Sequence, residues 1–239
     1  MNIEDTQNHR SRVAARRRAE TRAKLLESAL LVFAQKGPHA VIEDVIAQAG
    51  MARGSFYNYF RTNDELLGEV ASEINNELLR AIDPVALRSD DPAERLACGT
   101  RMVLHAVMRF PLFGSFMARL PFPTANSSLL GVRFMARDVA LGIAARRFRD
   151  ISVRVAADMV VGVVLSAAYT VAREPLERDY PDACVRALLR ALGLARSEAG
   201  RLASLPLPAF ELPDNSILRR TQMFQDESGM IAPSLIHPV

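Results

Sequence analysis

Apolar residues recur at intervals of three and four positions along most of the chain, which is the period of an amphipathic α-helix. The first such stripe lies between Leu25 and Phe33, and Gly37-Pro38 ends it because this pair does not continue a helix. The same period predicts helices over residues 20–36, 43–49, 52–60, 63–82, 92–109, 127–149, 152–173, 181–194 and 196–204. No segment alternates apolar and polar residues in the way that predicts a strand. The expected fold class is therefore all-α.

The chain divides by composition into four parts. Residues 1–19 are a basic N-terminal arm, residues 20–66 contain three short helical stripes, and residues 67–204 form a larger helical part. From Leu205 the periodicity is lost and prolines accumulate, so residues 205–239 are expected to be an extended or disordered Pro-rich tail. The longest uncharged stretch, residues 159–172, is too short to span a bilayer and is expected to be a buried helix, so no membrane partner is predicted.

Positive charge is concentrated near the N-terminus. Residues 1–61 contain ten Lys/Arg against six Asp/Glu, whereas residues 62–239 contain twenty against twenty-one. Much of the excess is one run that includes Arg16, Arg17 and Arg18. Such runs occur in solvated arms and also in modules that bind polyanions, where cations displace counterions from phosphates. Charge alone leaves both interpretations open.

The segment MARGSFYNYF, residues 51–60, places two kinds of residue on opposite sides of a helix. At about 100° per residue, Phe56 and Phe60 share one face, and Gly54 and Asn58 lie opposite. A glycine within a helix costs about 0.5–1 kcal/mol relative to alanine, which suggests that a partner approaches the backbone closely. Asn, Ser and Arg side chains bond base edges in the major groove, and tyrosine hydroxyls suit phosphate oxygens.

The residues before this segment strengthen the interpretation. A polar helix face by itself is most often simply solvated. Here a short helix over residues 43–49, a turn at Gly50 and a second short helix follow the order of a helix–turn–helix, whose second helix enters the major groove of DNA. Together with the basic arm, this order favours DNA binding.

Two stretches resemble the N-terminal domain of the tetracycline-repressor (TetR-type) family of bacterial transcription regulators: TRAKLLESALLVFAQKG and VIEDVIAQAGMARGSFYNYFRTNDELL. They cover about residues 21–67 and contain F-x-x-x-G, D-V-I-x-x-A-G, R-G-S-F-Y-x-Y-F and E-L-L at the family spacing. The resemblance implies that residues 20–66 are the DNA-binding domain. It also implies a set of residues that face DNA: Arg53, Gly54, Ser55, Tyr57, Asn58 and Tyr59. The basic arm adds three candidate phosphate contacts: Arg16, Arg17 and Arg18.

Three positions depart from the family pattern. Val41 and Ala52 stand where the family has hydroxyl side chains that cap the second and third helices. Asn63 replaces a lysine that often contacts phosphate. We expect these departures to weaken anchoring to the DNA backbone and the arginine-rich arm to offset the loss.

For residues 67–204 the resemblance implies a helical domain that dimerises through its last two long helices and often encloses a small-molecule site. The apolar stripes of those helices supply the candidate dimer interface: Val160, Val164, Ala168, Val185, Leu188, Leu189 and Leu192. The alternative is that these stripes belong to the core of one chain.

The candidate ligand site consists of large, adaptable side chains with polar neighbours: His105, Met108, Arg109, Phe113, Phe116, Met117, Phe134, Arg137, Asp138 and Tyr169. Met and Phe at helical spacing are more often core residues than ligand contacts, and a lone histidine on an apolar helix is most often a core residue too.

Motifs of catalysis, cofactor binding and metal ligation are not found in the sequence. The four histidines have no zinc or triad spacing, and there is no GxSxG and no phosphate-binding glycine loop. We therefore expect no enzyme, cofactor or metal. The resulting interpretation is a cytoplasmic, nucleoid-associated homodimer that binds a palindromic operator in double-stranded DNA, as a repressor released by a small, mostly apolar ligand. Two alternatives remain: a regulator without an effector, and one controlled by a protein partner through the helical domain or the tail.

Overall fold

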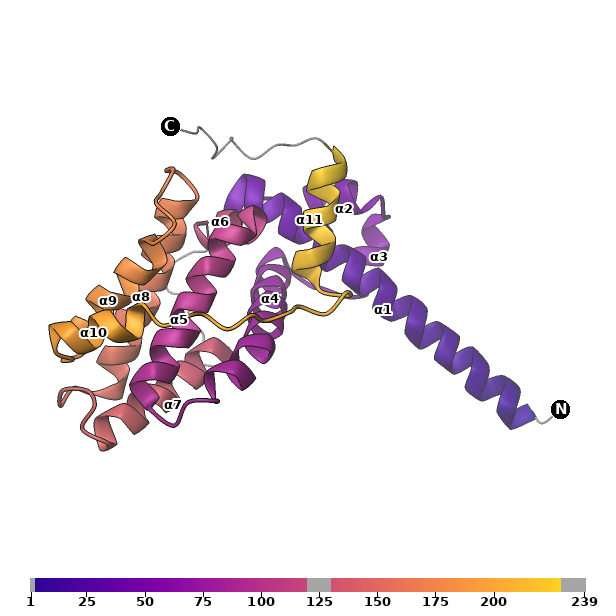
Figure 1. Cartoon of the computed structure of the whole chain (residues 1–239). Helices are drawn as coiled ribbons and strands as arrows, with labels where there is room; N and C mark the ends of the chain where they lie inside the picture. Colours follow the sequence, from indigo (N-terminus) through magenta and orange to yellow (C-terminus); the bar gives the residue numbers. More distant parts are fainter. Residues whose placement is uncertain (1–2, 120–129, 229–239) are drawn as a thin grey trace.

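The computed structural model describes residues 3–119 and 130–228, and these residues form helices and connecting segments without a strand. The helices are α1 (Ile3–Lys36), α2 (Ile42–Ala49), α3 (Arg53–Tyr57), α4 (Asn63–Ala86), α5 (Pro92–Arg109), α6 (Pro111–Met117), α7 (Leu130–Ala144), α8 (Val153–Val171), α9 (Tyr180–Ala191), α10 (Arg196–Ala203) and α11 (Ile217–Ser228). One turn of 3-10 helix, η1 (Gly37–His39), separates α1 from α2. The all-α fold class is confirmed (Figure 1).

Helix ends follow from local sequence chemistry. Thr62 Oγ1 accepts a hydrogen bond from the backbone N–H of Glu65 at 3.0 Å, which caps the start of α4. Gly50 ends α2 with φ 60°, a left-handed conformation that glycine adopts without steric cost. Helix α4 continues through Pro84 to Ala86, beyond the end expected at residue 82, because a proline in the last turn removes only one backbone hydrogen bond.

The basic arm is a continuation of the first helix. Helix α1 contains 34 residues, and its N-terminal half projects away from the other helices (Figure 1). Residues 11–20 are exposed apart from the half-buried Val13. Residues 11–19 are therefore helical and solvated, and the helix leads without interruption into the buried stripe that begins at Leu25.

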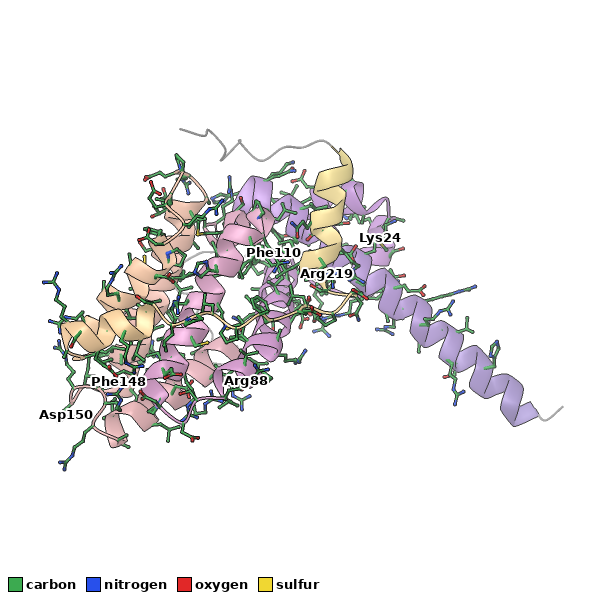
Figure 2. The ribbon with its side chains drawn as sticks, viewed as in Figure 1. Lys24, Arg88, Phe110, Phe148, Asp150 and Arg219 are labelled. Carbon is green, nitrogen blue, oxygen red and sulfur yellow. The ribbon has the colours of Figure 1, made fainter. Side chains whose placement is uncertain are left out.

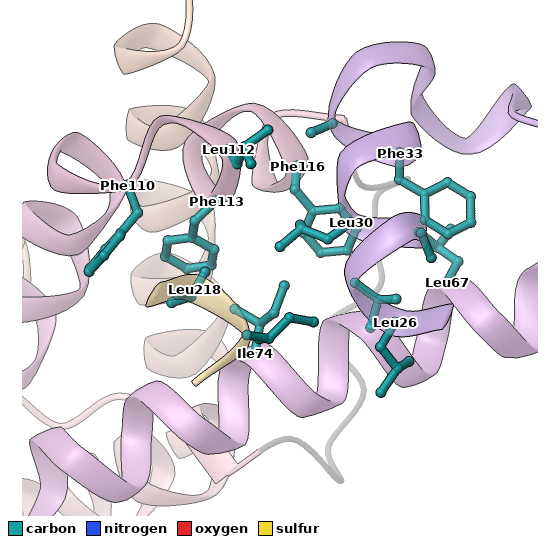
Figure 3. Packing of buried hydrophobic residues seen from close by; sticks show 14 of the residues in the cluster. Leu26, Leu30, Phe33, Leu67, Ile74, Phe110, Leu112, Phe113, Phe116 and Leu218 are labelled. Carbon is teal, nitrogen blue, oxygen red and sulfur yellow. The ribbon is translucent and has the colours of Figure 1, made fainter. Parts of the chain in front are cut away.

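Two clusters of buried apolar residues hold the helices together. The first joins α1, α2 and α3 to α4, α6, α11 and part of α5, and Figure 3 shows Phe116 of α6 beside Leu30 of α1 within it. The second joins α5, α7, α8, α9 and α10. Because the first cluster extends on both sides of residue 66, the three N-terminal helices share their core with the helices that follow.

The C-terminal tail differs from the expectation. Residues 205–216 cross the molecule largely without regular structure, and α11 then packs against α1 and α6 (Figure 1). Leu212, Ile217 and Leu218 are buried in the first cluster. Residues 205–216 are extended, which is one of the two expected alternatives, but the segment is not a detached appendage because its apolar residues anchor it to the body. Residues 229–239 lie outside the described residues.

Helix α8 has the length and composition of a helix that can cross a membrane, with a mean hydropathy of 1.5. The helix expected over residues 159–172 forms, and the single chain buries it only in part, because most of its residues are half-buried and Ser166 and Tyr169 are exposed. One side packs on α5, α6, α7 and α9. On the other side Val155 and Tyr169 are half exposed, which leaves an apolar surface uncovered in the single chain.

Arg147 connects the start of α5 to α10. Its guanidinium donates hydrogen bonds to Asp91 at 2.9 and 2.6 Å and to Glu198 at 2.7 Å. The bond from Arg147 lowers the pKa of Asp91, and bonds from Arg201 and Arg147 lower the pKa of Glu198 to about 2. A carboxyl group whose pKa is lower in the folded state than in the unfolded state stabilises the fold at pH values above its unfolded-state pKa. This contribution is lost as the pH falls through the folded-state pKa.

We predict that Arg147→Met lowers the free energy of unfolding by about 1 kcal/mol at neutral pH. The difference from the wild type should shrink as the pH falls from about 5 toward about 2, because the carboxyls then become protonated in both proteins. Urea unfolding at a series of pH values measures this. Arg16→Met, which removes an exposed pair with Glu20 on the projecting helix, is the matched control and should change little. A difference that stays constant over this pH range would contradict the prediction.

Candidate nucleic-acid interface and effector cavity

Helix α3 is attached to the body by two phenylalanine rings. A tight turn precedes it, in which the backbone N–H of Met51 donates to Ile46 O at 3.1 Å. Phe56 is completely buried and Phe60 is 3% exposed, with their ring centroids 6.0 Å apart. Helix α3 is shorter than the segment 52–60 that periodicity predicted, but its buried side is the predicted one.

The side of α3 opposite these rings faces solvent. Arg53, Gly54 and Asn58 are exposed, Tyr57 is 46% exposed, and the other two predicted DNA contacts are half-buried: Ser55 and Tyr59. A Cβ added to Gly54 would meet no atom within 4 Å. Packing within the chain therefore does not explain the glycine, and the backbone is open to an external partner.

Arg53 has partners within the chain. Its Nη1 lies 2.8 Å from Glu43 Oε1, and its guanidinium carbon lies 5.9 Å from the centroid of the Tyr57 ring. The Tyr57 hydroxyl, followed by the charge of Glu43, raises the pKa of Arg53. A phosphate or base that binds Arg53 must therefore replace the contact with Glu43.

The three departures from the family pattern have structural consequences. Val41 has no hydroxyl, so only half of a capping box forms at α2, in which Asp44 Oδ2 accepts from the Val41 N–H at 3.1 Å. Ala52 begins α3 without a side-chain cap. Asn63 Nδ2 donates to Ala40 O at 2.6 Å. Asn63 therefore ties α4 to the segment before α2, in the place of an outward-pointing lysine.

The C-terminal end of the basic arm lies beside the segment that follows α3. The guanidinium of Arg18 lies 5.7 Å from the centroid of the Tyr59 ring. Arg16 forms an exposed pair with Glu20 at 3.2 Å, and Arg17 is exposed. Figure 2 shows side chains standing out from the projecting half of α1, beyond the labelled Lys24. The arm thus places one cationic group, that of Arg18, against Tyr59, two residues after the end of α3.

A cavity of about 160 Å³ lies between α4, α5, α6, α7 and α8. Its wall is mostly apolar and includes Ile74, Leu78, Val160 and Val164. Five of the predicted ligand residues also line it: Phe113, Phe116, Met117, Phe134 and Asp138.

The other five predicted ligand residues do not line this cavity. His105 Nε2 lies 3.3 Å from Asp182 Oδ1, and Tyr169 is half exposed with Arg173 stacked on its ring at 3.7 Å. Arg109 is exposed, and Met108 is half-buried. Arg137 lies behind the wall, where it holds two carboxylates of the cavity.

These carboxylates form a polar end of the cavity that sequence reasoning found only in part. Arg137 donates to Asp138 at 2.9 and 3.0 Å and to Asp83 at 2.8 and 3.3 Å. Asp138, which is 4% exposed, and then Asp83 raise the pKa of Arg137. Arg95 Nε lies 3.8 Å from Asp138 Oδ1 and is buried without a hydrogen-bond partner among the described residues.

The polar end also includes Asn75 and Thr100, and Gly99 leaves room in front of them. A Cβ added to Gly99 would meet no atom within 4 Å. The spacing of Arg95, Gly99 and Val103 on one face of α5 was the sequence signal available for this site.

Comparison with known proteins identifies both parts of the chain. Residues 25–70 match the model of bacterial regulatory proteins of the tetR family, and residues 91–205 match the model of the tetracyclin repressor-like C-terminal domain. The chain belongs to the TetR family. TetR-family proteins are DNA-binding transcription regulators and not enzymes, which confirms the interpretation drawn from residues 21–67.

Individual TetR-family relatives differ in how much of the chain they match. Over 78 residues the chain is 33% identical to the HTH-type transcriptional repressor Rv3405c of Mycobacterium tuberculosis, a stretch that spans 32% of this chain and only 39% of the relative. The crystal structure of RolR without ligand is 28% identical, covers 80% of this chain and 100% of its own, and gives a TM-score of 0.66. The structure of RolR in complex with resorcinol is also 28% identical and has a TM-score of 0.65. It covers 82% of this chain and 100% of its own.

The predicted dimer residues are mostly buried in the chain itself. Val164 is half-buried, but the other six are 3% exposed or less: Val160, Ala168, Val185, Leu188, Leu189 and Leu192. The prediction that these six contact a second subunit is wrong, because the chosen stripes face the chain's own core. The apolar residues that α8 exposes are Val153, Val155 and Tyr169.

Potential metal ligands are scattered over the fold. Within the residues that the structure describes, no three or more His, Cys, Asp and Glu side chains are grouped so that they could hold a metal ion.

Proposed function

We propose that this TetR-family chain is a homodimeric repressor in the cytoplasm, associated with the nucleoid. In this proposal it binds a palindromic operator through α3 and leaves the operator when a small cyclic ligand occupies the cavity. The exposed side of α3 carries the DNA-binding part, because it surrounds a glycine that packing within the chain does not require. The relative Rv3405c, which is named a transcriptional repressor, supports repression.

The uncovered side of α8 supports a homodimer. Val155 and Tyr169 share one exposed side of a long helix, next to the half-buried apolar residues Met159 and Leu165. Two copies related by a two-fold axis would cover this surface with the same surface of the partner. The two recognition helices then enter successive major grooves, about 34–36 Å apart.

The cavity supports a ligand of one aromatic ring with hydroxyl groups. Its volume of about 160 Å³ compares with roughly 150 Å³ for an engineered apolar cavity that accepts benzene. Asp83, Asp138 and Arg95 provide acceptors and a donor at one end of an otherwise apolar space. RolR, which is 28% identical, has been crystallised with resorcinol, a ring with two hydroxyls. The ligand class is therefore more polar at one end than the mostly apolar molecule expected from sequence.

The cavity also favours this function over the two alternatives. A regulator without an effector is expected to fill its core with side chains, whereas here Gly99 borders open space. The tail is not favoured as a docking site for a protein partner over residues 212–221, because Leu212, Ile217 and Leu218 are buried within the chain.

Footprinting with the purified full chain near its own promoter tests the DNA-binding proposal. We predict one protected palindrome, and we predict that Asn58→Ala weakens binding to it by roughly 10- to 100-fold because its amide no longer bonds a base. Binding to unrelated DNA should change little. Asn215→Ala, the same substitution at an exposed position away from α3, is the matched control. Absence of a protected palindrome, or an equal weakening on unrelated DNA, would overturn the assignment of α3 as the recognition helix.

The arm should contribute affinity without sequence preference. Replacing Arg16, Arg17 and Arg18 with alanine is expected to weaken binding to operator and unrelated DNA alike. The slope of log K against log salt should become shallower by about 0.9 for each phosphate that the arm no longer neutralises. Fluorescence anisotropy over a range of salt concentrations measures both effects, and unchanged affinity and slope would show that the arm is only a solvated helix.

Thermal denaturation with resorcinol tests the ligand class. A ligand at about 100 times its Kd stabilises the folded state by about 2.7 kcal/mol, so the Tm of the wild type should rise by several degrees. Gly99→Leu should abolish the rise, because its side chain enters the cavity from a position where a Cβ meets no atom within 4 Å.

Gly68→Leu is the matched control for this substitution, because Gly68 is an exposed helical glycine with equally open space. It should keep the full rise in Tm. An equal rise in Gly99→Leu would place the ligand elsewhere. A wild type that no one-ring phenol stabilises would favour the regulator without an effector.

A further inference from the structure

The C-terminal segment lies almost entirely beyond the region that the family models match. The C-terminal model ends at residue 205, and α11 (Ile217–Ser228) follows it after an extended crossing. Figure 1 shows the chain leave α10 at one end of the molecule and return to α1, where α11 contacts α1 and α6. The segment thus connects the two ends of the fold a second time.

Apolar residues of this segment complete the first cluster. Ile217 and Leu218 are 3% and 1% exposed, and α11 contacts both α1 and α6. Figure 3 draws Leu218 beside Phe113 of α6, with Ile74 of α4 close by. Phe113 and Ile74 also line the cavity. Helix α11 therefore packs on the outer side of a wall whose inner side faces the ligand space.

Polar contacts tie the same helix to α1 and α4. Arg220 Nη2 lies 2.7 Å from Glu27 Oε1 of α1, and the Ile217 N–H donates to Glu77 Oε2 of α4 at 3.0 Å. Burial raises the pKa of both carboxyls. Glu77 Oε1 and Arg220 Nε are buried without a hydrogen-bond partner among the described residues. The polar contacts are thus incompletely satisfied, whereas Leu218 is 1% exposed within the first cluster.

We propose that α11 is a positioning element for the recognition helix. By packing on α1, α4 and α6 at once, it holds the DNA-binding helices at a fixed angle to the helices around the cavity. Helix α3 contacts DNA only after α11 has fixed this angle, so α11 acts through α1 and α4 and touches no DNA itself. The part of this inference that concerns DNA rests on the proposed function, whereas the mechanical part does not.

Hydrogen–deuterium exchange of the full chain tests the mechanical part. Leu218→Ala removes the apolar contact, and Arg220→Met removes the pair with Glu27 while keeping a long apolar side chain. Asp214→Asn is the matched control, because Asp214 is fully exposed in the same segment and pairs with Arg219. The amides of α2 and α3 are expected to exchange at least about 5-fold faster in Leu218→Ala than in the control, and to a smaller extent in Arg220→Met.

Exchange in α9, which belongs to the second cluster, reports global stability in the same experiment and should be unchanged. Faster exchange confined to α11 would overturn the inference, because α11 would then open without affecting α3. An equal increase in α9 would also overturn it, because α11 would then only add to overall stability.

Operator binding tests the part that concerns DNA. The wild type and Arg220→Met are compared on the operator and on a version with one base pair inserted between the half-sites, which shifts their spacing by about 3.4 Å. The ratio of the affinities for the two DNAs is expected to be at least about 3-fold smaller in Arg220→Met than in the wild type. The salt dependence of binding should be unchanged, because the substitution leaves the phosphate-binding groups in place. Equal discrimination in both proteins would overturn the positioning role. A wild type that binds no DNA would refute the proposed function instead, and the exchange measurement would still decide the role of α11.

Discussion

The fold depends on one hydrophobic cluster that the DNA-binding helices and the cavity share. Phe56 attaches the candidate recognition helix to this cluster, and Phe113 and Phe116 belong both to the cluster and to the wall of the cavity. Protein interiors are close-packed, so a ligand that moves these rings also moves the side chains that touch them on α1 and α4. Packing alone therefore links the cavity to the candidate recognition helix, without a dedicated chain of polar contacts.

The period of apolar residues predicted correctly which side of a helix is buried where neighbouring residues alone decide this. Two phenylalanines four positions apart predicted the buried side of α3, and Gly50 predicted the turn before it. The same reasoning failed for the dimer surface, because α8 is apolar on more than one side. Val160 and Ala168 face the chain's own core, whereas Val155 and Tyr169 remain exposed. A stripe of apolar residues does not indicate which of two apolar sides meets the rest of the same chain.

Features that depend on distant contacts were found only in part. Asp83 on α4 and Asp138 on α7 come together through Arg137, and no short motif joins residues so far apart in sequence. The tail was missed for a similar reason. Its prolines and weak periodicity are typical of disorder, and the burial of Leu218 depends on a surface that α1, α4 and α6 create only after folding.

If the cavity and the candidate recognition helix are coupled through shared packing, a ligand changes the distance between the two α3 helices of the proposed dimer, and this distance tests the coupling most directly. Gln48 is exposed on α2, so a spin label at Gln48→Cys, with Cys98 and Cys184 replaced by alanine, reports this distance by pulsed EPR. Saturating resorcinol should shift the distance distribution in this protein and leave it unchanged when Gly99→Leu fills the cavity. An unchanged distribution in a protein whose Tm resorcinol raises would contradict the account.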